Sequence, residues 1–595
     1  MNDDAGIRGV GVLDLPFEEF WLVDFEFRAE GGAAPSPICL VAHELRSGRR
    51  LRLWRDQFGP APPYRVDEGA LFIAYYASAE IGCHLALGWE TPVRILDLFT
   101  EFRNHTNGRR GADGETIKAG LLDAMAWFRL PGGDLSHKAA MRDLVRRAED
   151  IDQHRNDVLD YCESDVTALA ALLPAMAPHI DFPRALLRGR YMAAAARMEF
   201  VGIPIDVALH RRLHACWTDL KHRLIADVDH GFGIYEGRVF KIAKFETFLK
   251  REGVIWPRLD NGKPALDDDT FKEMALRHPK LDPLRQLRKT LDAMDDMKLV
   301  VGPDGRNRTL LSTFRSVTGR NQPSTTKFVF GLPSWLRSLI KPEQGRAVAY
   351  IDWSQQEFGI AAALSGDAQM QEAYRSGDPY LTFAVQAGAA PPDATKGSHK
   401  AVRDQFKAAV LAVQYQMTSF GLARRIGRSV LEANALLDLH RRTFAAFWAW
   451  SRRTENAALL RGFIQTVFGW TMHIGDRTKL RTIPNFPMQA NGAEMLRLAC
   501  CMATEAGINV VAPVHDAVMI EDHAATIDAT VARMQAIMAE ASRIVLGGFE
   551  LASDAVIVRW PDRYLDEKGA DMFERVMRLL MDLEGDTAQG VEQAA

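Results

Sequence analysis

The chain has 595 residues, of which 47% are hydrophobic and 25% charged, and its formal net charge is −4. These values are typical of a globular protein with several separate cores. No stretch of 18 apolar residues occurs, which excludes a membrane-spanning segment, and a net charge near zero gives no sign of a nucleic-acid partner.

The N-terminus has no signal-peptide pattern, so we expect a cytoplasmic protein. The six cysteines form no C-x-x-C pair and no Cys/His ligand spacing, which argues against structural zinc and favours reduced thiols. A basic run near residue 46 (RSGRRLRLWR) fits either a surface that binds nucleic-acid phosphates or the edge of a strand.

Residues 20–27, 37–42 and 71–76 read as strands and 158–176 as a helix, which predicts an α/β domain over 1–185. In the first strand Asp24 and Glu26 are two residues apart and therefore lie on one face. Inward-facing charges in a strand are costly without a partner, so metal binding is preferred to an acidic pair on an edge strand.

Residues 186–310 are charged and helical in character, which predicts an extended helical subdomain. The strand pattern at 347–353 ends near Asp352, and a strand-turn-strand pattern at 509–521 carries Asp516 in its turn. Two carboxylates brought together in this way can bind hard divalent cations, although a single strand-end Asp is more often a cap.

Between these strands, residues 366–460 are helical. Arg403 and Lys407 are four residues apart on one helix face, an arrangement suited to a triphosphate but also found on solvated basic faces.

Several of these segments resemble motifs of family A DNA polymerases, the bacterial DNA polymerase I family. AYIDWSQQEFGI and PVHDAVMIE are similar to the palm motifs D-Y-S-Q-x-E and V-H-D-E, although Ala517 replaces the Glu. The resemblance implies that Asp352 and Asp516 bind metal ions and that Glu357 excludes ribonucleotides. Gln355 of the first motif and His515 of the second are the other candidate site residues in these two palm motifs.

The segment RDQFKAAVLAVQYQMTSFGLAR resembles the family's fingers motif, R-x-x-x-K followed by Y-G. The resemblance implies that Arg403, Lys407 and Tyr415 contact the incoming nucleotide. Gln416 replaces the glycine, and Leu411 stands where the family has an aromatic residue, under the sugar. A tyrosine there lets members of the family accept dideoxynucleotides.

SVTGR and RTIPNFPMQ resemble two further motifs of the family, while the family's N-L-Q-N-I-P stretch is absent from 321–335. Minor-groove acceptors are nearly the same on every base pair, so polar contacts there test pair shape. The resemblance implies primer and template contacts from the following residues: Arg320, Arg481, Asn485 and Gln489. Tyr380 replaces a frequent triphosphate-contacting His.

WLVDFEF and YCESD resemble the D-x-E and Y-x-x-x-D motifs of DnaQ-like 3′→5′ exonucleases. By this resemblance Asp24, Glu26 and Asp165 are metal ligands, and Tyr161 positions the attacking water. Glu80 is the best candidate for the middle motif, where the family has Asp, and Asp97 is the alternative.

The two resemblances imply an α/β and α+β multidomain fold in which an RNase H-like exonuclease domain (1–185) precedes a right-hand polymerase. We expect a thumb at 186–310, a first palm part at 311–365, fingers at 366–460, and a second palm part at 461–595 that ends in a polar, disordered tail after about residue 584. No segment is left for a 5′ nuclease domain.

The implied function is template-directed DNA synthesis by two-metal-ion nucleotidyl transfer, with 3′→5′ proofreading. We expect two Mg²⁺ ions per active site, replaceable by Mn²⁺, with primer–template DNA and deoxynucleoside triphosphates as partners of a monomer.

Four alternatives stay open. A single-subunit RNA polymerase shares this plan, but the carboxylate of Glu357 argues against it. The others are a polymerase with a weakened exonuclease, a pure exonuclease with a silent polymerase, and a non-catalytic DNA-binding relic.

Overall fold

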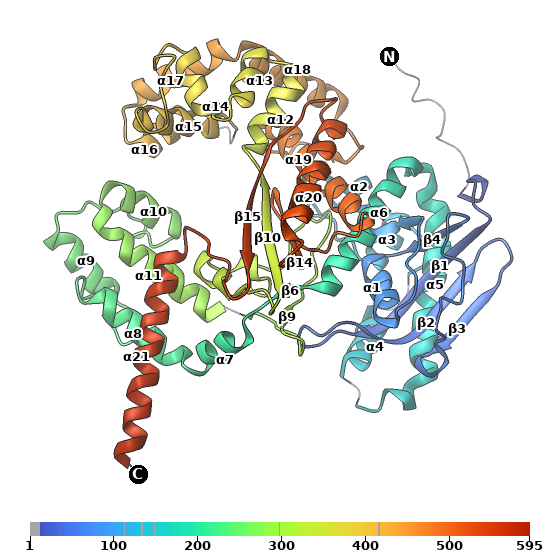
Figure 1. The fold of residues 1–595 in the computed structure, drawn as a ribbon. Helices are drawn as coiled ribbons and strands as arrows, with labels where there is room; N and C mark the ends of the chain where they lie inside the picture. The colour runs from blue at the N-terminus through green and yellow to red at the C-terminus, as the bar shows by residue number, and fades with distance from the viewer. Residues whose placement is uncertain are drawn as a thin grey trace.

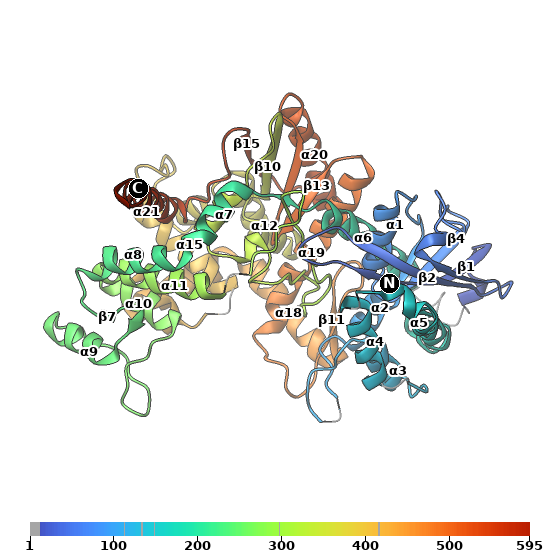
Figure 2. The same ribbon diagram turned by 90° about the horizontal axis from the view of Figure 1, so that it is seen from below.

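The computed structural model describes residues 12–111, 113–132, 135–147, 149–296, 298–414 and 417–594. An N-terminal α/β domain lies on one side of a central antiparallel sheet, and a helical arm lies on the other side (Figure 1). A second helical arm extends from one end of the sheet. Figure 2 shows the same separation of the N-terminal domain and the first arm from below.

The N-terminal domain is built on a five-stranded sheet in the order β3-β2-β1-β4-β5. β1 is antiparallel to β2 and parallel to β4. The strands are β1 (Glu19–Arg28), β2 (Ser36–Glu44), β3 (Arg50–Trp54), β4 (Ala70–Ala74) and β5 (Ile95–Asp97). The helices are α1 (Ser78–Leu87), α2 (Leu98–Thr106), α3 (Leu121–Trp127), α4 (Leu135–Arg147) and α5 (Arg155–Met176).

The two faces of β1 belong to different hydrophobic cores, because successive side chains of a strand point to opposite sides. Trp21 and Val23 pack into the core that includes α1 residues, whereas Phe20 and Leu22 pack into the core that includes α5 residues. Asp24 continues the second series and therefore faces α5.

The helix α6 (Phe182–Val201) connects this domain to the rest of the chain. The predicted boundary at residue 185 falls inside α6, which packs on both β5 and α19. Gly189 allows the close approach to β5, because a Cβ atom there would lie 2.0 Å from the carbonyl oxygen of Ile95.

Residues 203–307 form the first helical arm, whose apolar side chains belong to a core that they share with one face of the central sheet. Its helices are α7 (Val207–Ala215), α8 (Trp217–Asp229), α9 (Ile242–Arg251), α10 (Asp268–Arg277) and α11 (Asp282–Asp296). The short strands are β6 (Ile203–Pro204), β7 (Tyr235–Glu236), β8 (Val239–Phe240) and β9 (Arg306–Asn307).

The end of the chain differs from the prediction. Residues beyond about 584 were expected to be a disordered tail, but the helix α21 (Ala570–Ala594) runs through them. This helix packs on α8, and Arg575 forms an ion pair with Asp227 at 3.3 Å. The helix therefore begins in a packed part of the fold and continues into the polar end of the chain.

The central sheet has the order β13-β14-β10-β15, and every neighbouring pair is antiparallel. Its strands are β10 (Arg346–Trp353), β13 (Val510–Val514), β14 (Ala517–His523) and β15 (Ser553–Arg559). Ala349 and Ile351 of β10 pack into one core while Val348 packs into the other. By strand alternation Asp352 shares the face of Val348.

Helices α19 (Thr482–Glu505) and α20 (Ile527–Val545) pack against each other, and α20 also packs on β10. The small hairpin of β11 (Phe463–Gln465) and β12 (Thr471–His473) precedes α19. His473 donates its backbone N–H to Asn107 at 2.9 Å, which links this hairpin to the N-terminal domain.

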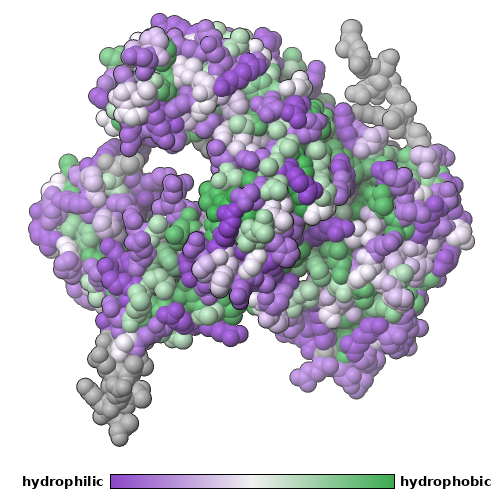
Figure 3. All heavy atoms as spheres, viewed as in Figure 1, coloured by the Kyte–Doolittle hydropathy of each residue, from purple (hydrophilic) through white to green (hydrophobic). Residues whose placement is uncertain are grey.

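The second helical arm covers residues 356–461, close to the range predicted as helical. It contains α12 (Gln356–Ser365), α13 (Ala368–Arg375), α14 (Pro379–Gln386), α15 (Lys400–Gln414), α16 (Ser419–Ile426), α17 (Val430–Thr443) and α18 (Ala445–Arg461). Figure 3 shows an open gap between this arm and the first one. An ion pair between Arg424 of α16 and Glu273 of α10 joins the two arms.

None of the helices in the described parts of the chain is both long and apolar enough to cross a membrane. All six cysteines are free thiols, as expected.

Candidate active sites

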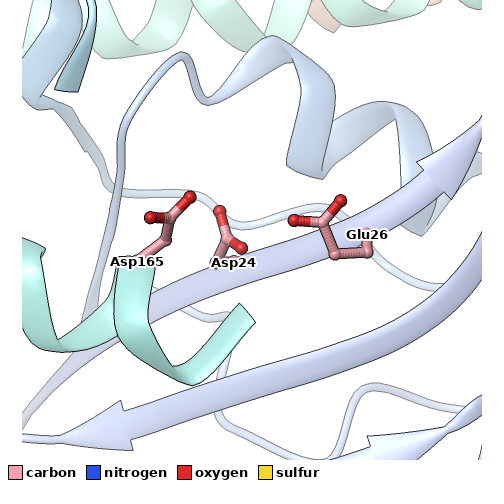
Figure 4. Close-up of side chains that lie close together, drawn as sticks. All are labelled: Asp24, Glu26 and Asp165. Atoms are coloured by element: carbon pink, nitrogen blue, oxygen red, sulfur yellow. The ribbon is translucent and has the colours of Figure 1, made fainter. Parts of the chain in front are cut away.

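Three carboxylates meet on the α5 side of the N-terminal sheet. Asp24 and Glu26 extend from β1, Asp165 extends from α5, and one oxygen of each lies within 4.8 Å of the others (Figure 4). Among the residues that the structure describes, no other group of three or more His, Cys, Asp or Glu side chains lies this close together.

Burial and mutual repulsion disfavour the charged forms of these acids. Burial, and then the neighbouring Asp165, raise the pKa of Asp24 to about 8. Burial also raises the pKa of Glu26 well above its usual range, with Asp24 as the next cause. A hard divalent cation would relieve this repulsion, and carboxylate oxygens are the ligands it prefers. The residues therefore fit a magnesium-type ion.

Glu80 is buried on α1 near this group but is not part of it. Its Oε2 accepts a hydrogen bond from the backbone N–H of Phe25 at 2.8 Å. Burial raises its pKa well above the usual range, and the charge of Asp24 adds to this effect.

Asp97, the alternative to Glu80, is occupied by backbone contacts. Its carboxylate caps α2 by accepting from the N–H of Thr100 at 2.6 Å, and it accepts from the N–H of Ala77 at 2.5 Å. Capping explains this buried acid without a metal ion, which favours Glu80 as the acid associated with the cluster.

Lys138 of α4 was not identified from the sequence. Its Nζ donates to both carboxylate oxygens of Asp165, at 2.6 and 2.7 Å, and lies 5.8 Å from the ring centroid of Tyr161. A lysine in a charged amphipathic helix carries no local signal of this contact, which spans 27 residues.

The second pair of acids lies in the central sheet. β13 and β14 form a hairpin in which Val514 pairs with Ala517, so His515 and Asp516 are its two-residue turn, as predicted. Asp352 lies opposite Ala517 on the adjacent strand β10. The backbone N–H of Trp353 donates to the carbonyl oxygen of Asp516 at 3.3 Å, which holds the turn beside the end of β10.

Burial disfavours the charged forms of both acids, and repulsion from neighbouring acids adds to this effect at Asp352. Burial, followed by the charges of Asp516 and Asp554, raises the pKa of Asp352 to about 7. Burial also raises the pKa of Asp516. Asp554 of β15 was not predicted as a site residue. It lies opposite Asp352 and accepts a hydrogen bond from the Ser354 hydroxyl at 2.5 Å.

Of these acids, Asp516 borders a cleft of about 380 Å³ between the sheet and the second arm. The cleft is lined by Arg320, Gln355, Gln356, Glu357, Phe358, Tyr380, Leu411, His515 and Asp516. Gln355 and His515 have φ angles of 46° and 56°. Such strained backbone in non-glycine residues is concentrated at functional sites.

Glu357 and Arg320 form an ion pair at 3.4 Å on the wall of this cleft. Burial raises the pKa of Glu357, and the charge of Arg320 opposes that shift.

The helix α15 carries three of the predicted nucleotide-binding residues. Arg403 donates from Nε to Asp378 at 2.5 Å, and Leu411 reaches the cleft. Arg403 and Lys407 both lie near the ring of Tyr380, at 5.4 and 5.7 Å from its centroid. Tyr415 lies outside the described residues.

The predicted DNA-contacting residues of α19 are not among those that line the cleft. Arg481 is exposed at the start of the helix, and Asn485 and Gln489 follow one turn apart and half-buried. The Asn485 Oδ1 atom is buried and has no hydrogen-bond partner among the described residues.

Residues 265–551 match the family model described as DNA polymerase family A. The chain is 23% identical to "DNA polymerase I, thermostable" of Thermus caldophilus over 354 residues, which is 55% of this chain and 42% of the relative. It is 25% identical to "DNA polymerase I" of Aquifex aeolicus over 446 residues, 68% of this chain and 75% of that protein. The chain thus spans less than half the length of the Thermus relative.

Among solved structures, the chain resembles "POL domain of Pol1 from M. smegmatis complex with DNA primer-template and dNTP", with a TM-score of 0.71 and 17% sequence identity. The match covers 93% of this chain and 96% of that one, and it confirms the expected multidomain fold. Residues 265–551, just under half of the chain, therefore match DNA polymerase family A, and the relatives named above are DNA polymerases I.

Proposed function

We propose that the protein is a template-directed DNA polymerase. The observation that carries the proposal is that Asp352, near the end of β10, lies beside the turn that holds Asp516, and that Asp516 lines a cleft whose other wall includes Leu411 of α15. The related structure named above contains primer–template DNA and a deoxynucleoside triphosphate, which supports the same partners here.

Each group has a task that follows from its chemistry. Asp352 and Asp516 would hold two Mg²⁺ ions, which activate the primer hydroxyl and neutralise the triphosphate when bound. Arg403 and Lys407 supply a planar guanidinium and a point charge for phosphate oxygens. Glu357, on the wall of the same cleft, would close the space that a ribose 2′-hydroxyl requires.

Contacts to the duplex are assigned to Arg320, Arg481, Asn485 and Gln489. We propose that 186–310 is the thumb, 366–460 the fingers, and 311–365 with 461–595 the palm. Asn485 offers a buried oxygen that has no hydrogen-bond partner in the described part of the chain, which suits a donor from outside the protein.

Primer extension with Mg²⁺ and all four deoxynucleotides tests the polymerase. Asp352→Ala and Asp516→Ala should each lower extension by more than about three orders of magnitude, because each removes a metal ligand. The matched control is Asp522→Ala, at the far end of β14, which should extend normally. Near-normal extension by the Asp352 or Asp516 variant would contradict the proposal.

We also propose a 3′→5′ exonuclease in the N-terminal domain (1–185), carried by the cluster of Asp24, Glu26 and Asp165. Tyr161 lies one turn before Asp165 on α5, where its hydroxyl would orient the attacking water.

Incubation of a mismatched primer without nucleotides tests this second activity. The variant Asp24→Ala/Glu26→Ala should stop primer shortening and keep extension intact, whereas Glu19→Ala, on the same strand, should change neither. If the double variant still degrades the primer, the nuclease site lies elsewhere. If the unmodified protein degrades none, the exonuclease proposal fails while the polymerase proposal stands.

A further inference from the structure

The carboxylates of the N-terminal domain already have a cation beside them. The Lys138 ammonium donates to both oxygens of Asp165, at 2.6 and 2.7 Å. The two side chains are only 16% and 15% exposed, so this ion pair is far better shielded from water than a surface pair.

The position of Lys138 is fixed by its surroundings. Its ammonium also lies 5.8 Å from the ring centroid of Tyr161, which is one turn before Asp165 on α5. The helix α4 packs against both β1 and α5, the two elements that carry the acids. The charge of Lys138 therefore acts on the whole cluster and not on Asp165 alone.

The lysine also reduces the number of free ligand atoms. Both oxygens of Asp165 accept from Lys138, and one oxygen of Glu80 accepts from Phe25. Asp24, whose Oδ2 accepts a weak thiol hydrogen bond from Cys162 at 3.2 Å, and Glu26 remain. One or two carboxylates with bound water are the usual protein ligands of a single Mg²⁺. A second divalent ion at Asp165 would have to approach the ammonium within a buried site, where like charges repel strongly.

On the proposed exonuclease function, we propose that Lys138 is the second cation of this site. Its ammonium stays on Asp165, and one divalent ion, instead of two, binds at Asp24 and Glu26. Lysine suits this place because its charge is compact and concentrated on one atom.

Counting bound Mn²⁺ by electron paramagnetic resonance tests the proposal independently of catalysis. The full-length chain with Asp352→Asn and Asp516→Asn removes the polymerase ligands, so the count reports the N-terminal site. We expect one Mn²⁺ in this background and none after Asp24→Ala/Glu26→Ala is added.

Lys138→Met should then bind two Mn²⁺, because the neutral side chain frees both oxygens of Asp165. Lys138→Arg should keep the count at one by keeping the charge. Arg146→Met, on the exposed face of α4, is the matched control and should also bind one. Lys138→Gln serves as a second neutral variant if the Met variant does not fold.

Two ions in the background protein, or any count other than two in the folded neutral variants, would overturn the proposal. The result is separable from the exonuclease assay. A count of one without primer degradation would remove the nuclease function and leave the cation assignment standing.

Discussion

Asp352 of β10 lies directly opposite Asp554 of β15, so a third carboxylate stands beside the two predicted metal ligands of the central sheet. The hydroxyl of Ser354 holds Asp554 at 2.5 Å. Ala517 leaves the hairpin with one acid fewer than the family motif. Asp554 supplies negative charge from the other side of β10.

Asp554→Asn should move the acidic limb of the pH profile for primer extension to lower pH. Asp352 has a pKa of about 7 and loses its metal-binding anionic form as the pH falls through that value. Removing the charge of Asp554 removes one cause of this raised pKa. Rates of single-nucleotide extension between pH 5.5 and 9 measure the shift, with Asp522→Asn as control. An unchanged limb, or one moved to higher pH, would show that Asp554 does not act on Asp352.

Asp24→Asn should stabilise the metal-free protein at pH 8. The pKa of Asp24 is raised to about 8, whereas an aspartate in the unfolded chain has a pKa of about 4. Ionisation of Asp24 therefore lowers the stability of the folded protein as the pH rises from about 4 to about 8. We expect a melting temperature at least about 2 °C higher, which corresponds to about 1 kcal/mol in a domain of this size. The gain should shrink towards pH 4.

Calorimetry in EDTA checks this stability prediction, with Glu19→Gln as control. A destabilised Asp24 variant at pH 8, or a gain that does not depend on pH, would contradict it.

Glu357→Ala should allow ribonucleotide incorporation. The side chain lines the cleft and is held by Arg320 at 3.4 Å, so its removal opens space beside the sugar. The expected gain is about tenfold or more, the scale on which pocket shape discriminates between similar substrates. Glu357→Gln keeps the volume and should keep the selectivity. Equal ribonucleotide use by the alanine variant and the parent would mean that another residue excludes ribonucleotides.

Leu411→Tyr should improve dideoxynucleotide incorporation. Leu411 lies one turn beyond Lys407 on α15 and reaches the cleft, where it offers neither a hydroxyl nor a ring. A tyrosine hydroxyl could replace the missing 3′-hydroxyl, and one such hydrogen bond is worth about threefold to tenfold. Leu411→Phe supplies the ring alone and should not improve incorporation. Chain-termination assays that give the tyrosine variant no advantage would mean that Leu411 only packs the helix.

Local patterns were sufficient to predict much of the fold and of both candidate sites. Alternation along β1 correctly placed Asp24 and Glu26 on one face, and two apolar runs around His515 and Asp516 correctly predicted a hairpin. These features depend on residues within one strand or one turn, where side-chain direction follows directly from sequence spacing.

Contacts between distant segments could not be predicted in the same way. Ser354 and Asp554 are 200 residues apart, and only the pairing of β10 with β15 brings them together. The basic run near residue 46 illustrates the same limit. It forms β3, where Arg50 and Arg52 pair with acids of α5, so the alternative of a strand edge explains these arginines.

The order of the central sheet also affects how the protein forms on the ribosome. The N-terminal sheet and α6 are complete by residue 201, but both neighbours of β10 come from residues 517–559. Chains are synthesised at about 5–20 residues per second, so both edges of β10 stay unpaired for roughly 10–40 s. Other chains can pair with these edges during that time. A nascent chain therefore carries a folded N-terminal domain well before Asp352 and Asp516 can meet. Mutations that slow the pairing of β14 or β15 should cause aggregation of new chains while leaving the activity of folded molecules unchanged.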